Sequence, residues 1–226
     1  MLYQSHASND ALIQHLINMG IIKTDIVAKV MKTVDRKFFS KSRFYDDSPQ
    51  TIGYGATLSA PHIHAHALEF LRPQLTLPSC RVLDVGCGSG YLSLCMSLMN
   101  DSKGKVVGVD HISELVDFSI KNVIQTGNKH LLENNSIKFV ASDGRQGYPP
   151  DQPYDVIYVG AAAPSVPTQL VDQLAIGGTM LIPVGSIVFG QKLKAFRKQS
   201  NGNLEITDEL DVCFVPLTDL NEQINR

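Results

Sequence analysis

The spacing of apolar residues changes between a helical period and a strand period along most of the chain. Near the start, apolar side chains recur every three or four positions over Asn9–Met19 and again from Thr24 to Val34, which predicts two amphipathic helices. Ser8 and Thr24 are suitable N-caps, and Gly20 suits the end of the first helix. We expect this pair to cover one end of a sheet and to help form the wall of a site.

Farther along, short β-branched runs alternate with helical patterns. The expected strands are Val82–Val85, Lys105–Asp110, Ile137–Ala141, Tyr154–Gly160 and Thr179–Val184. The expected helices are Tyr91–Met99, Ile112–Thr126 and Val166–Leu174. Two last strands, Gln191–Lys198 and Leu204–Pro216, flank the turn Asn201–Asn203 and predict an antiparallel hairpin. The predicted fold class is therefore α/β, with a mainly parallel sheet, an antiparallel C-terminal edge strand and an N-terminal helical cap.

Composition narrows the class of protein without identifying it. The 226 residues are 43% hydrophobic and 19% charged, as in an ordinary globular domain with a sizeable core. A net charge of -2 gives no general attraction to nucleic acid or to an anionic membrane. The sequence shows neither a long apolar span nor a charged-then-apolar leader, and its four cysteines lack the spacing of a zinc site or a disulfide framework. We expect a cytoplasmic protein with reduced thiols.

A glycine-rich turn follows the first strand of the alternating part. Gly86, Gly88 and Gly90 are spaced G-x-G-x-G, Asp84 precedes them, and Asp110 ends the next strand. Glycine allows positive φ and lets a ligand lie against the backbone, where the following helix presents free N–H groups. Taken alone, such a turn is also found as a plain strand-to-helix corner. The three glycines and two aspartates together favour a ligand site.

The aspartates indicate which ligand. A carboxylate at the end of the second strand, Asp110, suits the two hydroxyls of a ribose. A dinucleotide would place its pyrophosphate near Asp84, where two negative charges repel each other. S-adenosylmethionine carries a sulfonium and an ammonium group and no phosphate, so Asp84 would attract it. The sequence therefore favours S-adenosylmethionine as cofactor.

The segment from Asp46 to Pro61 has no helical period and is rich in glycine and hydroxyl residues, as binding loops and plain connectors both are. Its length favours a functional role. Pro61 suits the first turn of the next helix, which places Ser59 close to a helix N-terminus. In that helix His62 and His66 are four residues apart, but no third metal ligand is evident, so no metal is expected. His64 is a candidate substrate contact.

Another polar turn follows the strand Ile137–Ala141. Because ligands of open α/β sheets bind at the carboxyl ends of strands, Asp143 is placed to accept a hydrogen bond from an adenine amino group. The alternative is an Asp-Gly turn without a ligand. The run Ala161–Pro164 has small side chains that leave room for a ligand or a second chain.

These features together resemble one family over essentially the whole chain. The motifs that carry the likeness are Asp47–His64, Leu83–Gly90, Gly108–His111, Asp143–Tyr148, Tyr154–Asp155, Val159–Pro164 and Phe214–Asp219. The glycine turn is typical of any class I, Rossmann-like methyltransferase, whereas the first and last motifs are specific. The chain resembles protein-L-isoaspartate (D-aspartate) O-methyltransferases. The segments Asn128–Asn135 and Ile22–Asp25 are similar to the eukaryotic branch of that family.

The resemblance implies a repair enzyme that transfers a methyl group from S-adenosylmethionine to the free carboxyl of L-isoaspartyl residues in damaged proteins and peptides, and the family name extends this to D-aspartyl residues. The implied cofactor-binding residues are Asp84, Gly86, Gly88, Asp110, His111, Asp143 and Gly144. Thr57, Leu58, Ser59, His64 and Thr218 are implied to close over cofactor and substrate, with Ser59 in the catalytic position. We expect a single domain, with a helical cap and substrate loop at 1–77, a cofactor-binding core at 78–185, and a C-terminal hairpin and tail at 186–226. The expected state is a monomer without nucleic-acid or membrane partners.

The residue types agree with this chemistry. A carboxylate is ionised at neutral pH and is already a nucleophile, so no general base is required. A hydroxyl-rich loop can align it, whereas an arginine would quench it. Two other functions stay open: a methyltransferase for a small-molecule acid, which predicts a closed pocket, and a non-catalytic cofactor-binding module.

Overall fold

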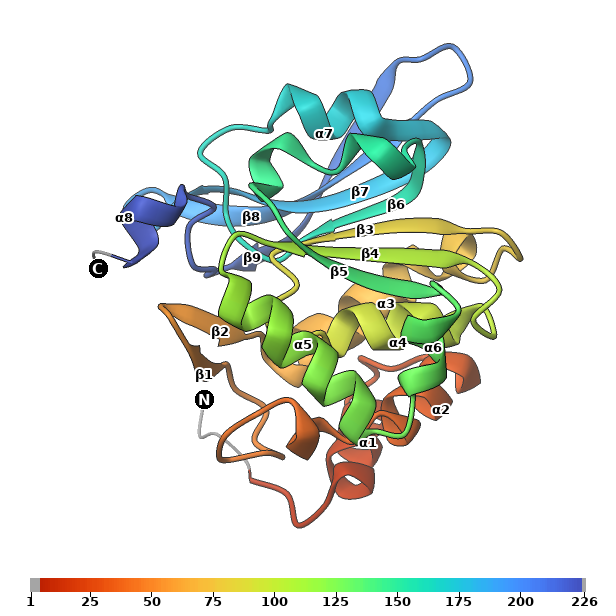
Figure 1. Ribbon diagram of the computed structural model, residues 1–226, viewed down its shortest axis with the longest axis vertical. Helices are drawn as coiled ribbons and strands as arrows, with labels where there is room; N and C mark the ends of the chain where they lie inside the picture. Colours follow the sequence, from red (N-terminus) through yellow and green to blue (C-terminus); the bar gives the residue numbers. More distant parts are fainter. Residues whose placement is uncertain (1–4, 225–226) are drawn as a thin grey trace.

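A computed structural model describes residues 5–224 of the chain. Its main feature is a seven-stranded sheet in the order β5-β4-β3-β6-β7-β8-β9 (Figure 1). The strands are β3 (Arg81–Val85), β4 (Lys105–Asp110), β5 (Ile137–Ala141), β6 (Tyr154–Val159), β7 (Leu174–Ser186), β8 (Gly190–Lys198) and β9 (Leu204–Val212). The first five strands in the spatial order are parallel, and β8 and β9 are added antiparallel. The predicted α/β class and the antiparallel C-terminal edge strand are confirmed.

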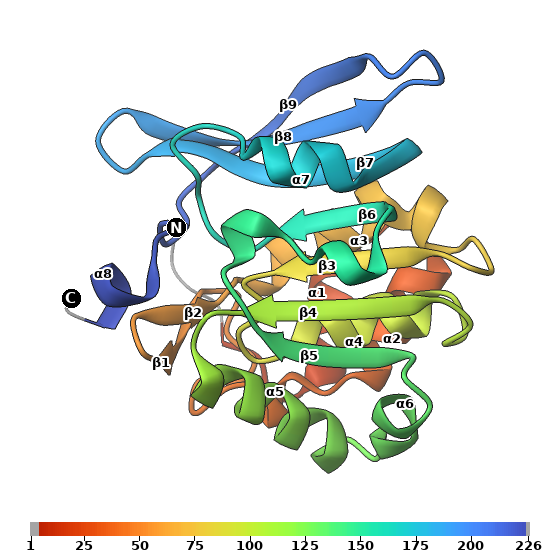
Figure 2. The ribbon, with the colours of Figure 1, turned by 45° about the horizontal axis from the view of Figure 1, so that its top comes forward.

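Helices cover both faces of the parallel part. One face carries α3 (Pro61–Leu75), α4 (Tyr91–Met99) and α5 (Ser113–Gln125), and the other carries α7 (Thr168–Gln173) (Figures 1 and 2). The remaining helical elements are α1 (Asn9–Asn18), α2 (Asp25–Thr33), α6 (Lys129–Glu133) and α8 (Leu220–Ile224), with short 3-10 turns at Arg36–Phe38, Gly144–Gln146 and Pro149–Asp151. Because α4 lies between the sheet and the N-terminal segment, its own residues are almost all buried. The helices predicted over Tyr91–Met99 and Ile112–Thr126 are present as α4 and α5.

Two predicted boundaries near β7 are wrong. The helix expected from Val166 begins only at Thr168 because Pro167 precedes it, and a residue before proline is disfavoured in the α conformation. The strand expected from Thr179 begins at Leu174, so Gly178 lies inside β7, next to an irregularity in its pairing with β6. A Cβ there would lie 2.9 Å from the Ala175 carbonyl oxygen, so only glycine fits.

The segment expected as an irregular loop contains a small hairpin. Strands β1 (Gln50–Gly53) and β2 (Ala56–Leu58) pair antiparallel. Tyr54 and Gly55 form the turn with φ of 53° and 69°, the left-handed values that short hairpin turns require. Strands of three and four residues leave too little alternation for the sequence pattern to predict them. The hairpin gives the segment a fixed course toward α3.

The two N-terminal helices pack on other helices. α2 contacts α3 and α4, and the apolar side chains of this helical pair join the large core beneath them. The predicted N-terminal helical cap is confirmed, and it packs through α2 on α3 and α4. Buried Asn9 joins the parts of this cap, because its Nδ2 donates to the carbonyls of Met31 and Lys32 at 2.9 and 3.2 Å. Its Oδ1 accepts from the backbone N–H of Arg36 at 3.5 Å.

Replacing Asn9 tests this connection. Asn9→Ala leaves buried carbonyls without a donor, so we expect unfolding free energy to fall by about 1–3 kcal/mol in urea titrations. Asn18→Ala is the matched control: its amide is exposed and, among the described residues, pairs with Gln14 alone, so stability should change by less than about 0.5 kcal/mol. Equal effects of the two substitutions would contradict a structural role for Asn9.

Candidate active site

The glycine turn brings backbone N–H groups to the carboxyl edge of the sheet. Gly86, Gly88 and Gly90 have φ of 72°, 55° and 79°, which residues with a side chain rarely adopt. The N–H of Gly86 donates to the Val109 carbonyl at 2.8 Å, so the chain folds back against β4 directly after β3. The predicted turn is confirmed, and glycine stands at the three positions of the turn where φ is positive.

Asp110 is held where β4 ends. Its Oδ2 accepts from the N–H of Gly88 at 3.2 Å and its Oδ1 from the N–H of Ile112 at 3.0 Å. The side chain is buried, and this burial raises the pKa of the Asp110 carboxyl against the opposing effect of the two hydrogen bonds. Each carboxylate oxygen keeps a free lone pair, so Asp110 can still accept from a pair of hydroxyls.

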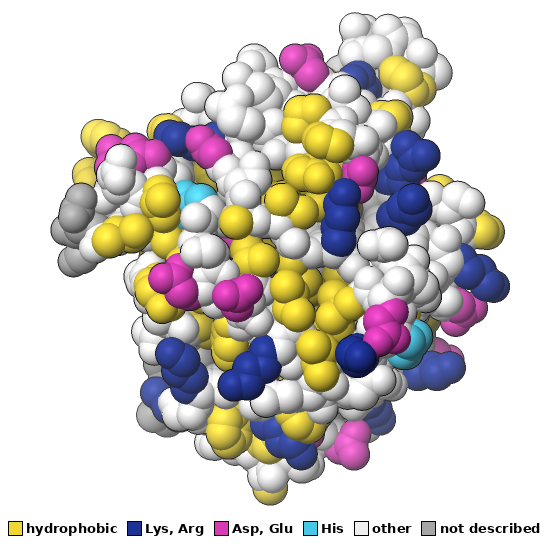
Figure 3. Space-filling model, in the orientation of Figure 1, with side chains coloured by type: hydrophobic (Ala, Val, Ile, Leu, Met, Phe, Trp, Pro, Cys, Tyr) yellow, Lys and Arg dark blue, Asp and Glu magenta, His cyan; other side chains and the backbone are white. Residues whose placement is uncertain are grey.

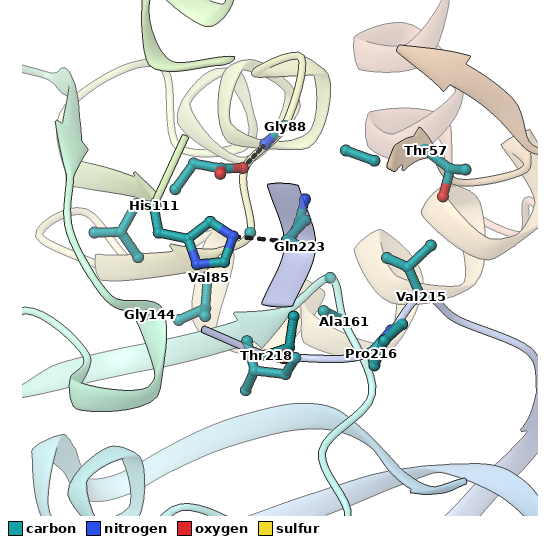
Figure 4. A pocket seen from close by; sticks show the side chains of 16 residues that line it. Thr57, Val85, Gly88, His111, Gly144, Ala161, Val215, Pro216, Thr218 and Gln223 are labelled. Atoms are coloured by element: carbon teal, nitrogen blue, oxygen red, sulfur yellow. Dashed lines mark hydrogen bonds between the residues drawn. The ribbon is translucent and has the colours of Figure 1, made fainter. Parts of the chain in front are cut away.

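A cavity opens beside this turn, and we call it the outer compartment (Figure 4). Seven of the predicted cofactor-site residues line it: Thr57, Gly86, Gly88, Asp110, His111, Gly144 and Thr218. Val85, Val109, Gly160, Ala161 and residues 215–217 add apolar walls and open backbone. Gly144 is required by close packing, since a Cβ would lie 2.6 Å from Val85 Cγ1. The lining of the compartment thus combines apolar side chains and glycine backbone with one carboxylate, that of Asp110.

A glutamine in the lining of the outer compartment was not among the predicted site residues. Gln223, on the short C-terminal helix α8, lies across the outer compartment with its Oε1 2.8 Å from His111 Nε2 (Figure 4). Its Nε2 donates to the Tyr54 carbonyl at 2.9 Å. Gln223 thus joins the β4 side of the compartment to the β1–β2 hairpin. No local motif marks this glutamine, because its role depends on where the tail folds.

A second cavity, the inner compartment, continues from the first past Thr57, Gly86 and Gly88. It contains the other predicted residues Leu58, Ser59, His64 and Asp84. Asp84 is buried and accepts a hydrogen bond from Ser93 Oγ at 2.5 Å. Burial raises the pKa of the Asp84 carboxyl to about 7, the Ser93 hydrogen bond opposes the rise, and the charge of Asp110 adds to it.

The inner compartment also holds buried polar groups that lack partners. The hydroxyls of Tyr158 and Ser89 are buried, line the cavity and have no hydrogen-bond partner among residues 5–224. Buried polar groups are rarely left unpaired in proteins. With Asp84 as acceptor and two hydroxyl donors, the compartment suits a group that carries both an ammonium and a carboxylate.

A groove of about 450 Å³ lies on the other side of the segment that contains Thr57 and Ser59, which we call the loop. Its lining comes from the loop and the start of α3 on one side and from residues 211–214 on the other. Thr57 and Ser59 line both the groove and the inner compartment, so they form the wall between the two spaces. A group in the groove can meet a group in the inner compartment only across this wall.

Two predicted features lie outside these compartments. The Asp143 carboxylate accepts from the Arg145 guanidinium at 2.8–3.1 Å and lines a depression that adjoins the outer compartment at His111. Its contact with an adenine stays a prediction. His62 binds Asp47, with Nδ1 2.8 Å from the carboxylate, and within the described residues no group of three or more His, Cys, Asp or Glu side chains could hold a metal ion.

Comparison with known proteins identifies the family. The family model for protein-L-isoaspartate(D-aspartate) O-methyltransferase matches residues 7–222. The chain belongs to this family. Protein-L-isoaspartate O-methyltransferase 1 of Arabidopsis thaliana is 46% identical over 218 residues, which cover 96% of this chain and 94% of that protein. The Caenorhabditis elegans protein-L-isoaspartate O-methyltransferase is 43% identical over 222 residues, 98% of this chain and 97% of that protein.

A solved structure supports the same assignment. A Plasmodium falciparum chain named as a protein-L-isoaspartate O-methyltransferase, in complex with S-adenosyl-L-homocysteine, superposes with a TM-score of 0.87 at 34% identity. The match covers 94% of this family member and 99% of that chain. Within the part of the chain that the structure describes, no helix has the length and apolar character needed to cross a membrane.

The buried Asp84 predicts a pH-dependent stability of the unliganded protein. Its pKa is about 7 when folded and about 3.9 when unfolded, so between these values the folded state keeps a proton that the unfolded state releases. Stability therefore falls as pH rises through this window. Asp84→Asn cannot ionise, so its stability advantage over the wild type should grow from about pH 4 to pH 7 and stay level above.

Urea unfolding at closely spaced pH values measures this difference. Asp101→Asn is the control, because the Asp101 side chain is 87% exposed and its substitution should give a difference that does not vary with pH. An advantage of Asp84→Asn that is equally independent of pH would contradict a costly buried carboxylate at residue 84.

Proposed function

We propose that this protein transfers the methyl group of S-adenosylmethionine to the free carboxyl of L-isoaspartyl residues in damaged proteins and peptides. The observation that carries the proposal is the wall formed by Thr57 and Ser59, which separates the inner compartment, with its buried Asp84, from the groove. Membership of the protein-L-isoaspartate(D-aspartate) O-methyltransferase family supports the same substrate. The methyl ester then closes to a succinimide, which reopens in part as normal aspartate.

The two compartments fit the proposed cofactor. In the outer compartment, Asp110 would accept hydrogen bonds from the ribose hydroxyls, and His111 and Gly144 would border the adenine, with Asp143 at the edge. In the inner compartment, Asp84 would accept from the ammonium group and the Tyr158 hydroxyl would gain the partner it lacks. When bound, S-adenosylmethionine supplies an electrophilic methyl group on its positively charged sulfur.

The residues of the chain then have to position a nucleophile. Ser59 reaches both spaces and would donate a hydrogen bond that holds the isoaspartyl carboxylate at the wall. Apart from Cys213, the ionisable side chains that line the groove are Asp47, His62 and Asp211. The described lining therefore offers no lysine or arginine that would bind the carboxylate tightly. A single neutral donor aligns the carboxylate without quenching it. Alignment and removal of water together can be worth roughly 7–11 kcal/mol.

The surface charges and the cysteines bear on where the protein works and on what it binds. Acidic and basic side chains are interspersed on the face shown in Figure 3, and the net charge is -2. Cys80, Cys87, Cys95 and Cys213 are free thiols, as in proteins of a reducing compartment. These features support a protein that works as a monomer in the cytoplasm on protein substrates, without binding nucleic acid or membranes. Activity on D-aspartyl residues rests on the family resemblance alone.

Labelling of matched peptides tests the reaction. The protein is incubated with methyl-labelled S-adenosylmethionine and either an isoaspartyl peptide or its aspartyl twin. We expect a base-labile label on the isoaspartyl peptide only. Its peptide bond runs through the side-chain carboxyl, which leaves the α-carboxyl free to reach the wall and places it differently from the side-chain carboxyl of the aspartyl twin. Equal labelling of both peptides, or of neither, would contradict the proposal. Preferential labelling of a small carboxylic acid would favour the small-molecule alternative.

Two variants separate the role of the wall from that of the outer compartment. Ser59→Ala removes a hydrogen bond to a charged group, so kcat should fall at least about tenfold while the Kd for S-adenosylhomocysteine changes less than about twofold. Asp110→Asn should show the opposite pattern, with a Kd weakened about tenfold or more in calorimetry. Lost cofactor binding in Ser59→Ala, or an unchanged Kd in Asp110→Asn, would show that the roles are misassigned.

A further inference from the structure

A buried arginine with no carboxylate partner lies behind the proposed active site. Arg36, in the short turn after α2, is 1% exposed, and no described residue forms an ion pair with it. Its guanidinium lies 5.4 Å from the centre of the Tyr91 ring. Burial lowers the pKa of Arg36 to about 10, with the nearby charges of Tyr91 and Asp47 opposing the shift, so the side chain stays protonated at neutral pH. A buried charge of this kind is costly, which calls for a role.

The guanidinium makes two hydrogen bonds to described residues, and both lead to the active site. Nη2 donates to the carbonyl oxygen of Ser59 at 2.5 Å, and Nη1 lies 3.2 Å from Nδ1 of His64. Ser59 is in the wall, and His64 lines the inner compartment. One planar side chain therefore holds the backbone of the wall and the imidazole of the compartment at the same time.

The contact with His64 determines where the imidazole carries its proton. A guanidinium has only donors, so Nδ1 of His64 must accept. The ring is buried, and this burial together with the charge of Arg36 lowers the pKa of His64 well below its usual value. A neutral imidazole with Nδ1 as acceptor has its proton on Nε2. No described residue accepts from Nε2, so this N–H is available to a ligand in the inner compartment.

We propose that Arg36 is a positioning residue that fixes His64 as a neutral Nε2–H donor toward the carboxylate of the bound cofactor's amino-acid end and anchors the Ser59 carbonyl in the wall. Asp84 and His64 would then receive the two opposite charges of that end, one as acceptor and one as donor. Lysine could not replace Arg36 fully, because an ammonium lacks the planar fork that spans both acceptors. This inference rests on the proposed cofactor but not on the isoaspartyl substrate.

Nitrogen NMR of the unliganded protein measures the tautomer directly. With ¹⁵N-labelled histidine, His64→Gln assigns the His64 signals, and we expect the wild type to show unprotonated Nδ1 and protonated Nε2 with no titration between pH 6 and pH 8. A wild-type His64 that is protonated at Nδ1, or that titrates in this range, overturns the proposal, and this measurement needs no arginine variant to fold.

Variants then connect the tautomer to binding. Arg36→Met should give a mixture of His64 tautomers and weaken S-adenosylhomocysteine binding about tenfold or more in calorimetry, with Arg36→Lys in between. Asn9→Ala is the matched control, because it loosens the same turn through the Arg36 N–H but keeps the guanidinium, so the His64 tautomer should not change. An unchanged tautomer in Arg36→Met, or an equal change in Asn9→Ala, contradicts positioning by the guanidinium. Failure of peptide methylation with the expected tautomer would count against the proposed substrate only.

Discussion

The reversal of the chain after β3 is the constraint on which the rest of the site depends. β3 and β4 are adjacent and parallel, and the turn between β3 and α4 must pass over the end of β4. Gly86, Gly88 and Gly90 give this turn its positive φ values, and the turn points the Gly88 N–H at Asp110. The β3–α4 turn and the carboxylate that borders the outer compartment therefore come from one hydrogen-bonded unit. Thr57, His111 and Thr218 are then brought to it by separate segments.

Around this unit the protein keeps charged groups in places that cost folding free energy. Asp84, Asp110 and Arg36 are all buried, and none of the three has an ion-pair partner among the described residues. Such groups lower stability unless they are paired. The large apolar core beneath α3 and α4 offsets this cost. In the proposed reaction Asp84 would face the ammonium group of the cofactor and Asp110 its ribose. Arg36 would hold the wall and His64.

Sequence patterns predicted the elements of the α/β core because those elements are regular and their residues interact locally. The glycine turn, Asp110 and the helix beginning at Pro61 were all predictable for that reason. Arg36 and Gln223 were missed, since each reaches the site from an element that is distant in sequence. Nothing near Arg36 in the chain indicates that Ser59 and His64 will surround its side chain. The β1–β2 hairpin was missed because its strands are too short to show alternation.

The inner compartment and the groove share Thr57 and Ser59, and the two sides of this wall draw on the same two parts of the chain, residues 56–64 and residues 211–218. A protein chain that lies in the groove can therefore present a single side chain at Thr57 and Ser59, while the cofactor occupies the other side of the same two residues.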